Sequence, residues 1–259
     1  MQQKLIDRFS LSGEVALITG AGRGIGRAIA LAYAEAGADV VCAARSPDEI
    51  EETARLAREH GVRALALTCD VNDEAALARL VDTTREAMGK LTLLVNNAGG
   101  AAPNKMLKTS ADAFDTAMHF NVTSAFRLSA LVAPHMQAAG HGAIVNITSG
   151  AARYAQKHFT VYGAAKAALT QLTRLMAQDL APLIRVNAIA PGPIATDALE
   201  KFLDETARGK MIAGTPLARL GTVEDIAAAA LYLASPAASW VTGKVIEVDG
   251  GAESSVWPF

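Results

Sequence analysis

The chain has 259 residues and a mass of 26.9 kDa, enough for one large α/β domain or two small ones with a sizeable core. Hydrophobic residues make up 51% and charged residues 19% of the chain, a balance that excludes a disordered protein. The formal charge of -2, without a dense basic block, lacks the electrostatic footprint of nucleic-acid binding, so no nucleic-acid partner is expected.

The first residues, "MQQKLIDRFSLSG", carry Lys4, Asp7 and Arg8 where a signal peptide needs an apolar run. No segment approaches the roughly 18 uninterrupted apolar residues of a membrane span. We therefore expect a cytoplasmic protein with no membrane partner. Cys42 and Cys69 form no metal-type pair and are interpreted as buried thiols, and the histidines form no close ligand pair, so no metal site is predicted.

Seven short β-rich runs alternate with amphipathic helical patterns from Val15 to Asp249. This order predicts a parallel sheet, and several runs are apolar throughout, as expected when helices cover both faces. We therefore predict an α/β fold with one domain over residues 1–259, a Rossmann-type, doubly wound parallel sheet of about seven strands with helices on both faces. The expected strands are residues 15–19, 39–44, 63–68, 91–96, 142–148, 184–190 and 244–249.

Capping patterns mark two helix starts in this alternation. Ser46, followed by a proline and by Glu49 three residues on, predicts one start, and Thr222 with Asp225 is a weaker copy. The longest departure is residues 191–220, where turn residues flank a short helical stretch. We predict that this segment covers a substrate, and the alternative is an ordinary helical excursion packed on the surface.

The stretch "VALITGAGRGIGRAIALAYAEAG" reads strand, glycine-rich turn, helix. Small residues let the backbone approach a ligand's phosphates, and the helix N-terminus adds unpaired N–H groups and the positive end of the helix dipole. Because the turn joins a strand to a helix in a βαβ series, it predicts a dinucleotide site rather than tight packing alone. The turn residues expected at the cofactor are Gly20, Arg23, Gly24, Ile25 and Gly26.

The end of the second predicted strand indicates which dinucleotide is bound. An acidic side chain there would bind the ribose 2′-hydroxyl and repel a 2′-phosphate, but the chain has Ala44 followed by Arg45. Arg45 and Arg23 can each make forked, charge-assisted hydrogen bonds to a phosphate. NADP(H) is therefore predicted to be preferred over NAD(H), against the alternative that both arginines are solvated surface charges.

On these motifs the chain resembles the short-chain dehydrogenase/reductase family over essentially its whole length. "TGAGRGIG" at 19–26 is similar to the family's TGxxxGxG turn, "NNAG" at 96–99 to its sheet-end motif, and "PGPIAT" at 191–196 to the loop that holds the nicotinamide end. The family's catalytic tetrad is matched in order and spacing by Asn121, Ser149, Tyr162 and Lys166.

The resemblance implies contacts to the cofactor. Asp70 would hydrogen-bond the adenine, Val71 and Asn97 would line the nucleoside, and Ile194 and Thr196 would contact the carboxamide and phosphate side. Two of these residues have local alternatives, because Asp70 can cap the loop before "NDEAAL" and Thr196 can cap the helix "DALEKF".

Tyr162 and Lys166 lie one helical turn apart, so their side chains can reach each other. Reducing a ketone leaves an alkoxide that needs a proton, and a tyrosine with pKa near 10 becomes a useful base only when that pKa falls by about 3 units. We therefore predict Tyr162 as the acid/base, with its pKa lowered by Lys166 in a water-poor site and by the positive nicotinamide. The family also implies that Lys166 binds the nicotinamide ribose.

The other two tetrad residues have supporting roles in this interpretation. Ser149 follows a predicted strand and is expected to donate to the substrate oxygen, whereas its neighbour Thr148 points to the opposite face. The resemblance implies that Asn121 holds a water that links Lys166 to bulk solvent. The alternative for Asn121 is a satisfied core amide.

The functional hypothesis is an NADP(H)-dependent oxidoreductase that interconverts a ketone and a secondary alcohol. Within the family, the chain resembles bacterial hydroxysteroid dehydrogenases, with a 3-oxoacyl-thioester reductase as the alternative and a non-catalytic NADP(H)-binding sensor as the alternative of another class. An apolar substrate is suggested by Met106, Tyr154, Phe159, Leu199 and Phe202.

The family also implies a homotetramer, built through a four-helix seam between neighbouring subunits. The tail "SSVWPF" ends the chain with two large aromatic side chains, Trp257 and Phe259. The sequence leaves open whether this tail packs across an interface or frays.

Overall fold

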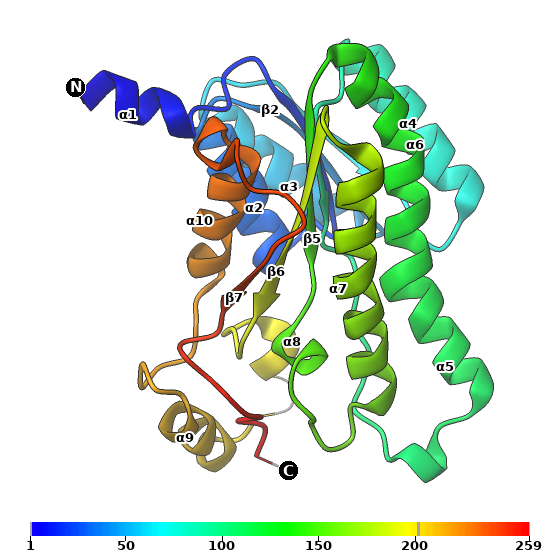
Figure 1. Cartoon of the computed structure of the whole chain (residues 1–259), viewed down its shortest axis with the longest axis vertical. Coiled ribbons are helices and arrows are strands. Elements are labelled where there is room, and N and C mark those ends of the chain that lie inside the picture. The colour runs from blue at the N-terminus through cyan, green and yellow to red at the C-terminus, as the bar shows by residue number, and fades with distance from the viewer. Residues whose placement is uncertain (1, 201–202, 259) are drawn as a thin grey trace.

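The computed structural model describes residues 2–200 and 203–258, and its centre is a seven-stranded sheet (Figure 1). The strand order is β3-β2-β1-β4-β5-β6-β7, and every neighbouring pair is parallel. The predicted doubly wound sheet is therefore confirmed, and each strand end lies within two residues of its predicted position. The strands are β1 (Val15–Thr19), β2 (Asp39–Ala44), β3 (Ala64–Thr68), β4 (Leu93–Asn96), β5 (Gly142–Ile147), β6 (Ile184–Pro191) and β7 (Val245–Val248).

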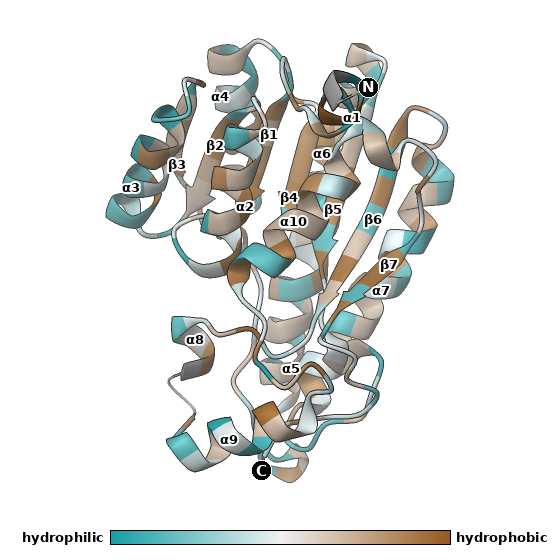
Figure 2. Ribbon diagram, turned by 90° about the vertical axis from the view of Figure 1, so that its left-hand side faces the viewer, coloured by the Kyte–Doolittle hydropathy of each residue, from teal (hydrophilic) through white to brown (hydrophobic). Residues whose placement is uncertain are grey.

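Helices cover both faces of the sheet (Figures 1 and 2). On one face lie α2 (Gly24–Glu35), α3 (Pro47–Arg58) and α10 (Val223–Ala234), and on the other α4 (Glu74–Met88), α6 (Ser124–Ala139) and α7 (Thr160–Leu180). Strand β1 shows why the strands are apolar throughout. Ala16 and Ile18 join the core under the first three helices, whereas Val15 and Leu17 join the core under the other three.

The remaining elements are short or lie outside the two helix layers. They are α1 (Gln2–Phe9), η1 (Met106–Lys108), α5 (Ala111–Met118), η2 (His119–Thr123), η3 (Gly150–Ala152), α8 (Asp197–Glu200), α9 (Glu205–Gly214) and η4 (Pro236–Ala238). The sequence analysis did not predict α1, which projects from the body of the molecule in Figure 1 and leaves its apolar residues Leu5 and Ile6 exposed. Among the described residues, no helix is both long and apolar enough to cross a membrane.

Of the two predicted helix caps, the one expected to be weaker is complete in the structure, and the one expected to be stronger is not. Thr222 and Asp225 form a complete capping box at the start of α10, with hydrogen bonds of 3.4 and 2.8 Å. Ser46 precedes α3 as predicted, but within the described residues its hydroxyl makes no capping hydrogen bond. The Glu49 carboxylate extends instead toward the glycine turn, where it lies 3.8 Å from the guanidinium of Arg23. An ion pair has thus replaced the local cap.

The strand order creates a crevice at the carboxyl end of the sheet. The chain runs outward from β1 to β3 and then returns to β4 on the other side of β1, so the connections after β1 and β4 diverge. Asn97, which follows β4, crosses back to the glycine turn, because its amide donates to the carbonyls of Thr19 at 2.9 Å and Gly20 at 3.2 Å. This crevice is the place where doubly wound folds bind their ligands.

Candidate active site

A cleft of about 730 Å³ lies along the carboxyl ends of the central strands, a volume suited to a cofactor-sized ligand. Its walls come from the glycine turn after β1, the segments after β4 and β5, the start of α7, and the loop after β6. Every predicted site residue except Asn121 lines this cleft. The structure therefore brings together residues that are separated by up to about two thirds of the sequence.

The glycine turn fits a phosphate group. Gly20 and Gly24 have φ angles of +64° and +55°, a region that side chains strain to adopt, and a Cβ at Gly26 would lie 2.2 Å from the carbonyl oxygen of Gly20. Helix α2 begins at Gly24, and no capping side chain or first-turn carboxylate among the described residues occupies its N-terminus. The turn therefore offers open N–H groups and a positive dipole end to an anion.

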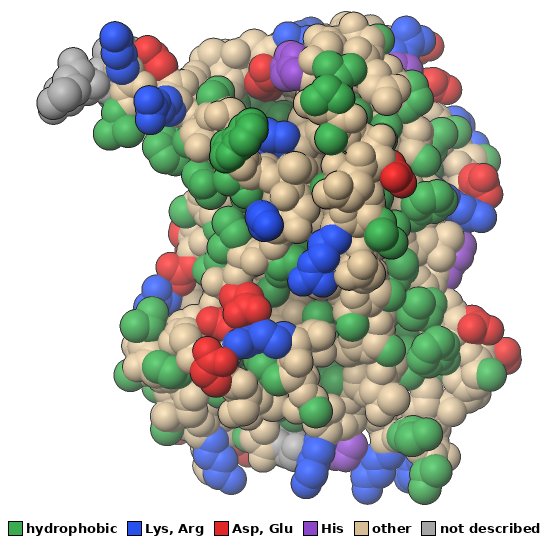
Figure 3. All heavy atoms as spheres, viewed as in Figure 1, with side chains coloured by type: hydrophobic (Ala, Val, Ile, Leu, Met, Phe, Trp, Pro, Cys, Tyr) green, Lys and Arg blue, Asp and Glu red, His purple; other side chains and the backbone are tan. Residues whose placement is uncertain are grey.

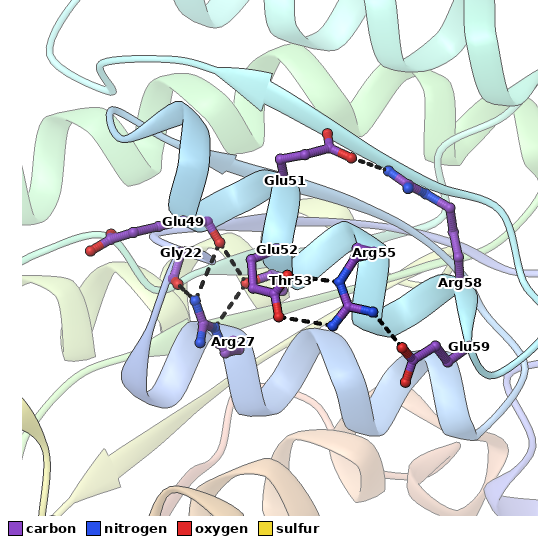
Figure 4. A network of polar contacts seen from close by, with 9 residues as sticks. All are labelled: Gly22, Arg27, Glu49, Glu51, Glu52, Thr53, Arg55, Arg58 and Glu59. Atoms are coloured by element: carbon purple, nitrogen blue, oxygen red, sulfur yellow. Dashed lines mark hydrogen bonds and ion pairs between the residues drawn. The ribbon is translucent and has the colours of Figure 1, made fainter.

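A polar network that the sequence analysis missed holds this turn against α3 (Figure 4). Arg27, on α2, donates to the carbonyl oxygens of Gly22 and Glu49 and, through Nε, to the hydroxyl of Thr53 at 3.0 Å. The fully buried Thr53 in turn donates to the carbonyl of Ala21 at 2.9 Å. The sequence analysis missed Arg27 because it lies one residue beyond the glycine motif. Its partner Thr53 is a single short polar residue of α3, which by itself predicts no contact.

Arg45 and Arg23 stand at the rim where the sequence predicts a 2′-phosphate. Arg45 is exposed and lines the cleft, directly after β2. Arg23 has a side chain that is 56% exposed, and Glu49 beside it is 40% exposed. The rim thus carries two cations and one anion, so the positive charge that Arg23 offers to a phosphate is partly balanced.

Asp70 and Thr196 line the cleft and also make the local contacts that were their alternatives. The Asp70 carboxylate accepts hydrogen bonds from the backbone N–H and the side-chain amide of Asn72, both at 3.0 Å. Thr196 accepts from the N–H of Leu199 at 3.3 Å and so caps α8. The Asp70 carboxylate and the Thr196 hydroxyl can each accept further hydrogen bonds from a ligand in the cleft, because these local bonds do not use all of their lone pairs.

Ser149, Tyr162 and Lys166 meet at one end of the cleft. Ser149 follows β5, its hydroxyl accepts from the N–H of Ala151 at 3.2 Å, and it lies close enough to Tyr162 to act on the pKa of the phenol. Thr148 is turned away as predicted, since its hydroxyl donates to the carbonyl of Ile189 at 2.9 Å. Lys166 lies on α7 one turn after Tyr162, and its Nζ is 5.7 Å from the centroid of the Tyr162 ring.

The electrostatics of this group differ from the sequence prediction. Burial raises the pKa of Tyr162, and the nearby Ser149 hydroxyl only partly opposes that rise. Burial also lowers the pKa of Lys166 to about 8, and its Nζ donates to the carbonyl of Ile147 at 2.9 Å. The predicted lowering of the Tyr162 pKa by Lys166 is therefore wrong for the protein by itself, because both groups lose solvent and the ammonium is bonded elsewhere.

Asn121 lies behind this group, in a π-helical turn between α5 and α6. It is 1% exposed, its amide oxygen accepts from the N–H of Gly100 at 2.8 Å, and its amide nitrogen donates to the carbonyls of Gly100 at 3.0 Å and Ala117 at 2.9 Å. These contacts are those of a satisfied core amide. A Cβ at Gly99 would lie 2.8 Å from this amide oxygen and 2.9 Å from Lys166 Nζ, so Asn121 and Lys166 flank the same glycine.

The predicted apolar substrate residues divide in the structure. Phe159 and Leu199 line the cleft. Met106 is 68% exposed and, like Tyr154, is not part of the cleft wall. Phe202 lies outside the described residues.

The structure also shows the positions of the two cysteines and of Trp257, which the sequence analysis discussed. Cys42 and Cys69 are buried free thiols as predicted, and burial raises their pKa to about 12 and about 11. Trp257, whose place the sequence left open, lines the cleft next to Phe159.

Comparisons with known proteins agree with this geometry. The sequence family described as enoyl-(acyl carrier protein) reductase matches residues 20–253. A 7alpha-hydroxysteroid dehydrogenase of Escherichia coli is 46% identical over 246 residues, covering 95% of this chain and 96% of that protein. A 3-oxoacyl-(acyl-carrier-protein) reductase of Pseudomonas aeruginosa is 38% identical over 243 residues, with coverage of 93% and 98%.

A solved structure is also similar over nearly the whole chain. It is a 7 alpha-hydroxysteroid dehydrogenase complexed with NADH and 7-oxo glycochenodeoxycholic acid, with a TM-score of 0.94, 44% identity, and coverage of 96% of this chain and 98% of that one. Fold and site together define an oxidoreductase that acts on CH–OH groups with a nicotinamide cofactor. The chain belongs to the short-chain dehydrogenase/reductase family.

Proposed function

We propose that the protein is an NADP(H)-preferring oxidoreductase that interconverts a ketone and a secondary alcohol on an apolar substrate of the hydroxysteroid type. The observation that carries the proposal is the meeting of Ser149, the buried Tyr162 and Lys166 at one end of a cleft whose other end is the glycine turn. The similarity to 7alpha-hydroxysteroid dehydrogenase supports the substrate type.

When bound, the nicotinamide supplies or accepts the hydride. Ser149 then donates a hydrogen bond to the substrate oxygen, where charge develops, and Tyr162 moves a proton to or from that oxygen. Lys166 has a pKa of about 8, so it is mostly protonated at neutral pH, and together with the positive nicotinamide of a bound oxidised cofactor it would favour the tyrosinate form of its neighbour. Asn121 would support this group by holding both backbone polar groups of Gly100, next to the glycine that it flanks together with Lys166.

The proposed cofactor contacts follow from the residues along the cleft. Gly20, Gly24 and Gly26 would admit the phosphates, as the Cβ positions of the turn support. Arg23 and Arg45 would take the 2′-phosphate of NADP(H), Lys166 the nicotinamide ribose, and the remaining residues the adenine, nucleoside and carboxamide. These remaining residues are Ile25, Asp70, Val71, Asn97, Ile194 and Thr196.

The cofactor preference depends on the charges at the end of β2 and at the rim of the cleft. Ala44 leaves the end of β2 without a carboxylate, and Arg45 follows it, which supports NADP(H). Glu49 opposes this preference through its contact with Arg23, and the similar hydroxysteroid dehydrogenase was solved with NADH. We propose that the two arginines outweigh the single carboxylate at the rim, because charge-assisted bonds to a phosphate are strong.

We further propose that the chain acts as one domain in which residues 191–220 cover the substrate. Helices α8 and α9 lie in this segment, and Pro191, Ile194 and Leu199 from it reach the cleft wall. A segment that begins at the cofactor end of the cleft and continues along its side is well placed to close over a bound molecule.

We also propose a homotetramer. Phe126 on α6 and Leu175 on α7 keep side chains that are 52% and 55% exposed, on the layer where the family forms its helix seam. Figure 3 shows further hydrophobic side chains over the surface of this helix layer. Light scattering during size-exclusion chromatography tests the assembly, and a monomer at micromolar concentration would contradict it.

The experiment for the proposed function is a substrate panel followed by the absorbance of the reduced nicotinamide. The panel contains a 7-oxo steroid, a simple cyclic ketone and a 3-oxoacyl thioester, each with NADPH and with NADH. We expect the steroid to have the highest kcat/KM. Turnover of the thioester alone would support the reductase alternative, and cofactor binding without consumption on any substrate would support a sensor.

A further inference from the structure

The C-terminal tail, residues 249–258, leaves the end of β7 and runs to the lower end of the molecule beside α9 (Figures 1 and 2). Trp257, near the end of this tail, meets the ring of Phe159 edge to face, with centroids 5.1 Å apart and planes at 84°. Phe159 in turn meets the ring of Tyr162 at 5.8 Å and 67°. An unbroken row of aromatic rings therefore leads from the tail to the proposed acid/base.

We infer that Trp257 is a wall of the substrate site that selects the fused-ring body of the substrate, and that Arg153 is the positioning residue that holds its tail. The inference rests on the proposed function and names the residue that recognises the substrate class. It concerns the substrate end of the cleft, because Trp257 lies beside Phe159 and Tyr162, whereas Arg45 and Asp70 follow β2 and β3 on the far side of the sheet.

Arg153 ties the tail to the segment that carries Ser149. Its guanidinium lies 3.3 Å from the Glu247 carboxylate, pairs with Asp249 at 3.2 Å and Glu253 at 2.9 Å, and donates to the carbonyl of Ala252. The side chain of Asp249 is only 8% exposed, so removal of Arg153 would leave a nearly buried carboxylate without its cation. At the position of β7 and the tail, Figure 3 shows acidic side chains gathered around a basic one.

The tail is also packed against the segment that follows α9. A Cβ at Gly214 would lie 3.1 Å from Cγ1 of Val256, the residue before Trp257. Farther up the tail, the N–H of Leu217 donates to the carbonyl of Gly250 at 3.1 Å. The tail is therefore held by the η3 segment and by the covering segment, and this double attachment fixes the indole at the cleft.

A fixed indole discriminates by shape. A large aromatic side chain buries on the order of 150–250 Å² in total, and a fused-ring body covers more of the flat indole face than a single small ring does. The contribution of Trp257 should therefore grow with the number of fused rings in the substrate. The hydride-transfer chemistry at Tyr162 stays the same.

The first test uses Trp257→Ala with Trp240→Ala as its matched control, because Trp240 is the other tryptophan of the chain and is 99% exposed. For Trp257→Ala we expect kcat/KM on a 7-oxo steroid to fall at least about tenfold, mainly through KM. Turnover of a simple cyclic ketone and the Kd of the cofactor should stay within about threefold of wild type. Equal losses on both ketones, or no loss on either, would overturn the inference.

The second test asks whether Arg153 holds the tail, by measuring KM after Arg153 is replaced. Arg153→Ala should reproduce the KM effect of Trp257→Ala on the steroid, and Arg153→Lys should restore part of it. Arg153→Ala that lowers kcat on both ketones equally, without a change in KM, would show that Arg153 acts only on the fold.

The third test does not depend on turnover. Trp240→Phe leaves Trp257 as the single tryptophan, and oxidised cofactor with a 7-oxo steroid forms a complex that cannot react. We expect the steroid to change the emission of Trp257 in a saturable way. Unchanged emission at steroid concentrations that saturate turnover would overturn the inference, whereas loss of all turnover with an intact emission change would count against the proposed function alone.

Discussion

The Nζ of Lys166 lies 5.7 Å from the centroid of the Tyr162 ring and donates to the carbonyl of Ile147 at 2.9 Å. Both side chains are buried, and burial acts against the charged form of each, raising the pKa of the phenol and lowering that of the ammonium. In the protein, the charged forms of both Tyr162 and Lys166 are therefore destabilised by burial. Any charge that stabilises tyrosinate must overcome this loss of hydration.

The buried ammonium predicts a distinctive pH dependence of stability. The unfolded chain keeps this proton up to about pH 10.5 and the folded chain releases it near pH 8, so the unfolded state binds more protons between these values. Stability should therefore rise with pH across this window. Relative to Lys166→Met, the wild type should gain about 3 kcal/mol from pH 7 to pH 10.5.

Urea unfolding of wild type and Lys166→Met across this pH range checks the prediction, because the titrations of all other groups cancel in the difference. The lost hydrogen bond to Ile147 adds only a constant offset. A difference between the two proteins that does not depend on pH would contradict a depressed pKa at Lys166.

The network of Arg27 predicts a role in cofactor binding (Figure 4). Arg27→Met removes the bonds that hold the carbonyls of Gly22 and Glu49, so the glycine turn should loosen and the Kd of the cofactor should rise about tenfold. Arg55→Met is the matched control, because within the described residues Arg55 pairs only with Glu52 and Glu59, on the exposed side of α3. Fluorescence titration of the reduced cofactor measures both, and equal Kd values for the two variants would refute the role.

The charged rim of the cleft predicts opposite shifts for two substitutions. Arg45→Asp should lower the ratio of kcat/KM for NADPH over NADH by about 10- to 100-fold, through loss of a charge-assisted contact and addition of a like charge. Glu49→Gln should raise the same ratio a few-fold, since it frees Arg23 from its 3.8 Å contact. Steady-state kinetics with both cofactors test this, and a shift toward NADH in Glu49→Gln would count against the assignment of Arg23.

Asn121 and Lys166 leave no room for a side chain at Gly99, which predicts the effect of a small substitution there. In Gly99→Ala the new Cβ would meet Asn121 Oδ1 at 2.8 Å and Lys166 Nζ at 2.9 Å, so one of them must shift. We expect kcat to fall about tenfold or more, as is usual when a group that tunes an acid/base moves. Gly209→Ala is the control, because Gly209 on α9 has open space around its Cβ position, and the prediction is wrong if both variants turn over like wild type.

The sheet and the cofactor cleft were predictable because strong local patterns determine them. All-apolar strands buried on both faces, such as Val40 to Ala43 of β2, and a glycine turn at a strand end leave few alternative arrangements. The Tyr162–Lys166 spacing and the position of Ser149 after β5 likewise follow from chain order. These features depend on neighbours in the sequence.

The features that were missed depend on partners far apart in the chain. Ser46 makes no capping hydrogen bond within the described residues, and Glu49 lies instead 3.8 Å from Arg23, which is far earlier in the chain. Asn121 lies in a π-helical turn, and its side chain donates to the carbonyl of Gly100, which belongs to another segment of the chain. Trp257 meets Phe159 almost a hundred residues earlier in the chain, so nothing in the tail itself indicated its place.

The central claim is that Tyr162 carries the proton. Its most direct test is Tyr162→Phe, measured by single-turnover oxidation of the bound reduced cofactor with a 7-oxo steroid, alongside the Kd of the cofactor. The account predicts a loss of at least about 100-fold in the rate, with a Kd within about threefold of wild type. A variant that transfers hydride at the wild-type rate would contradict the claim.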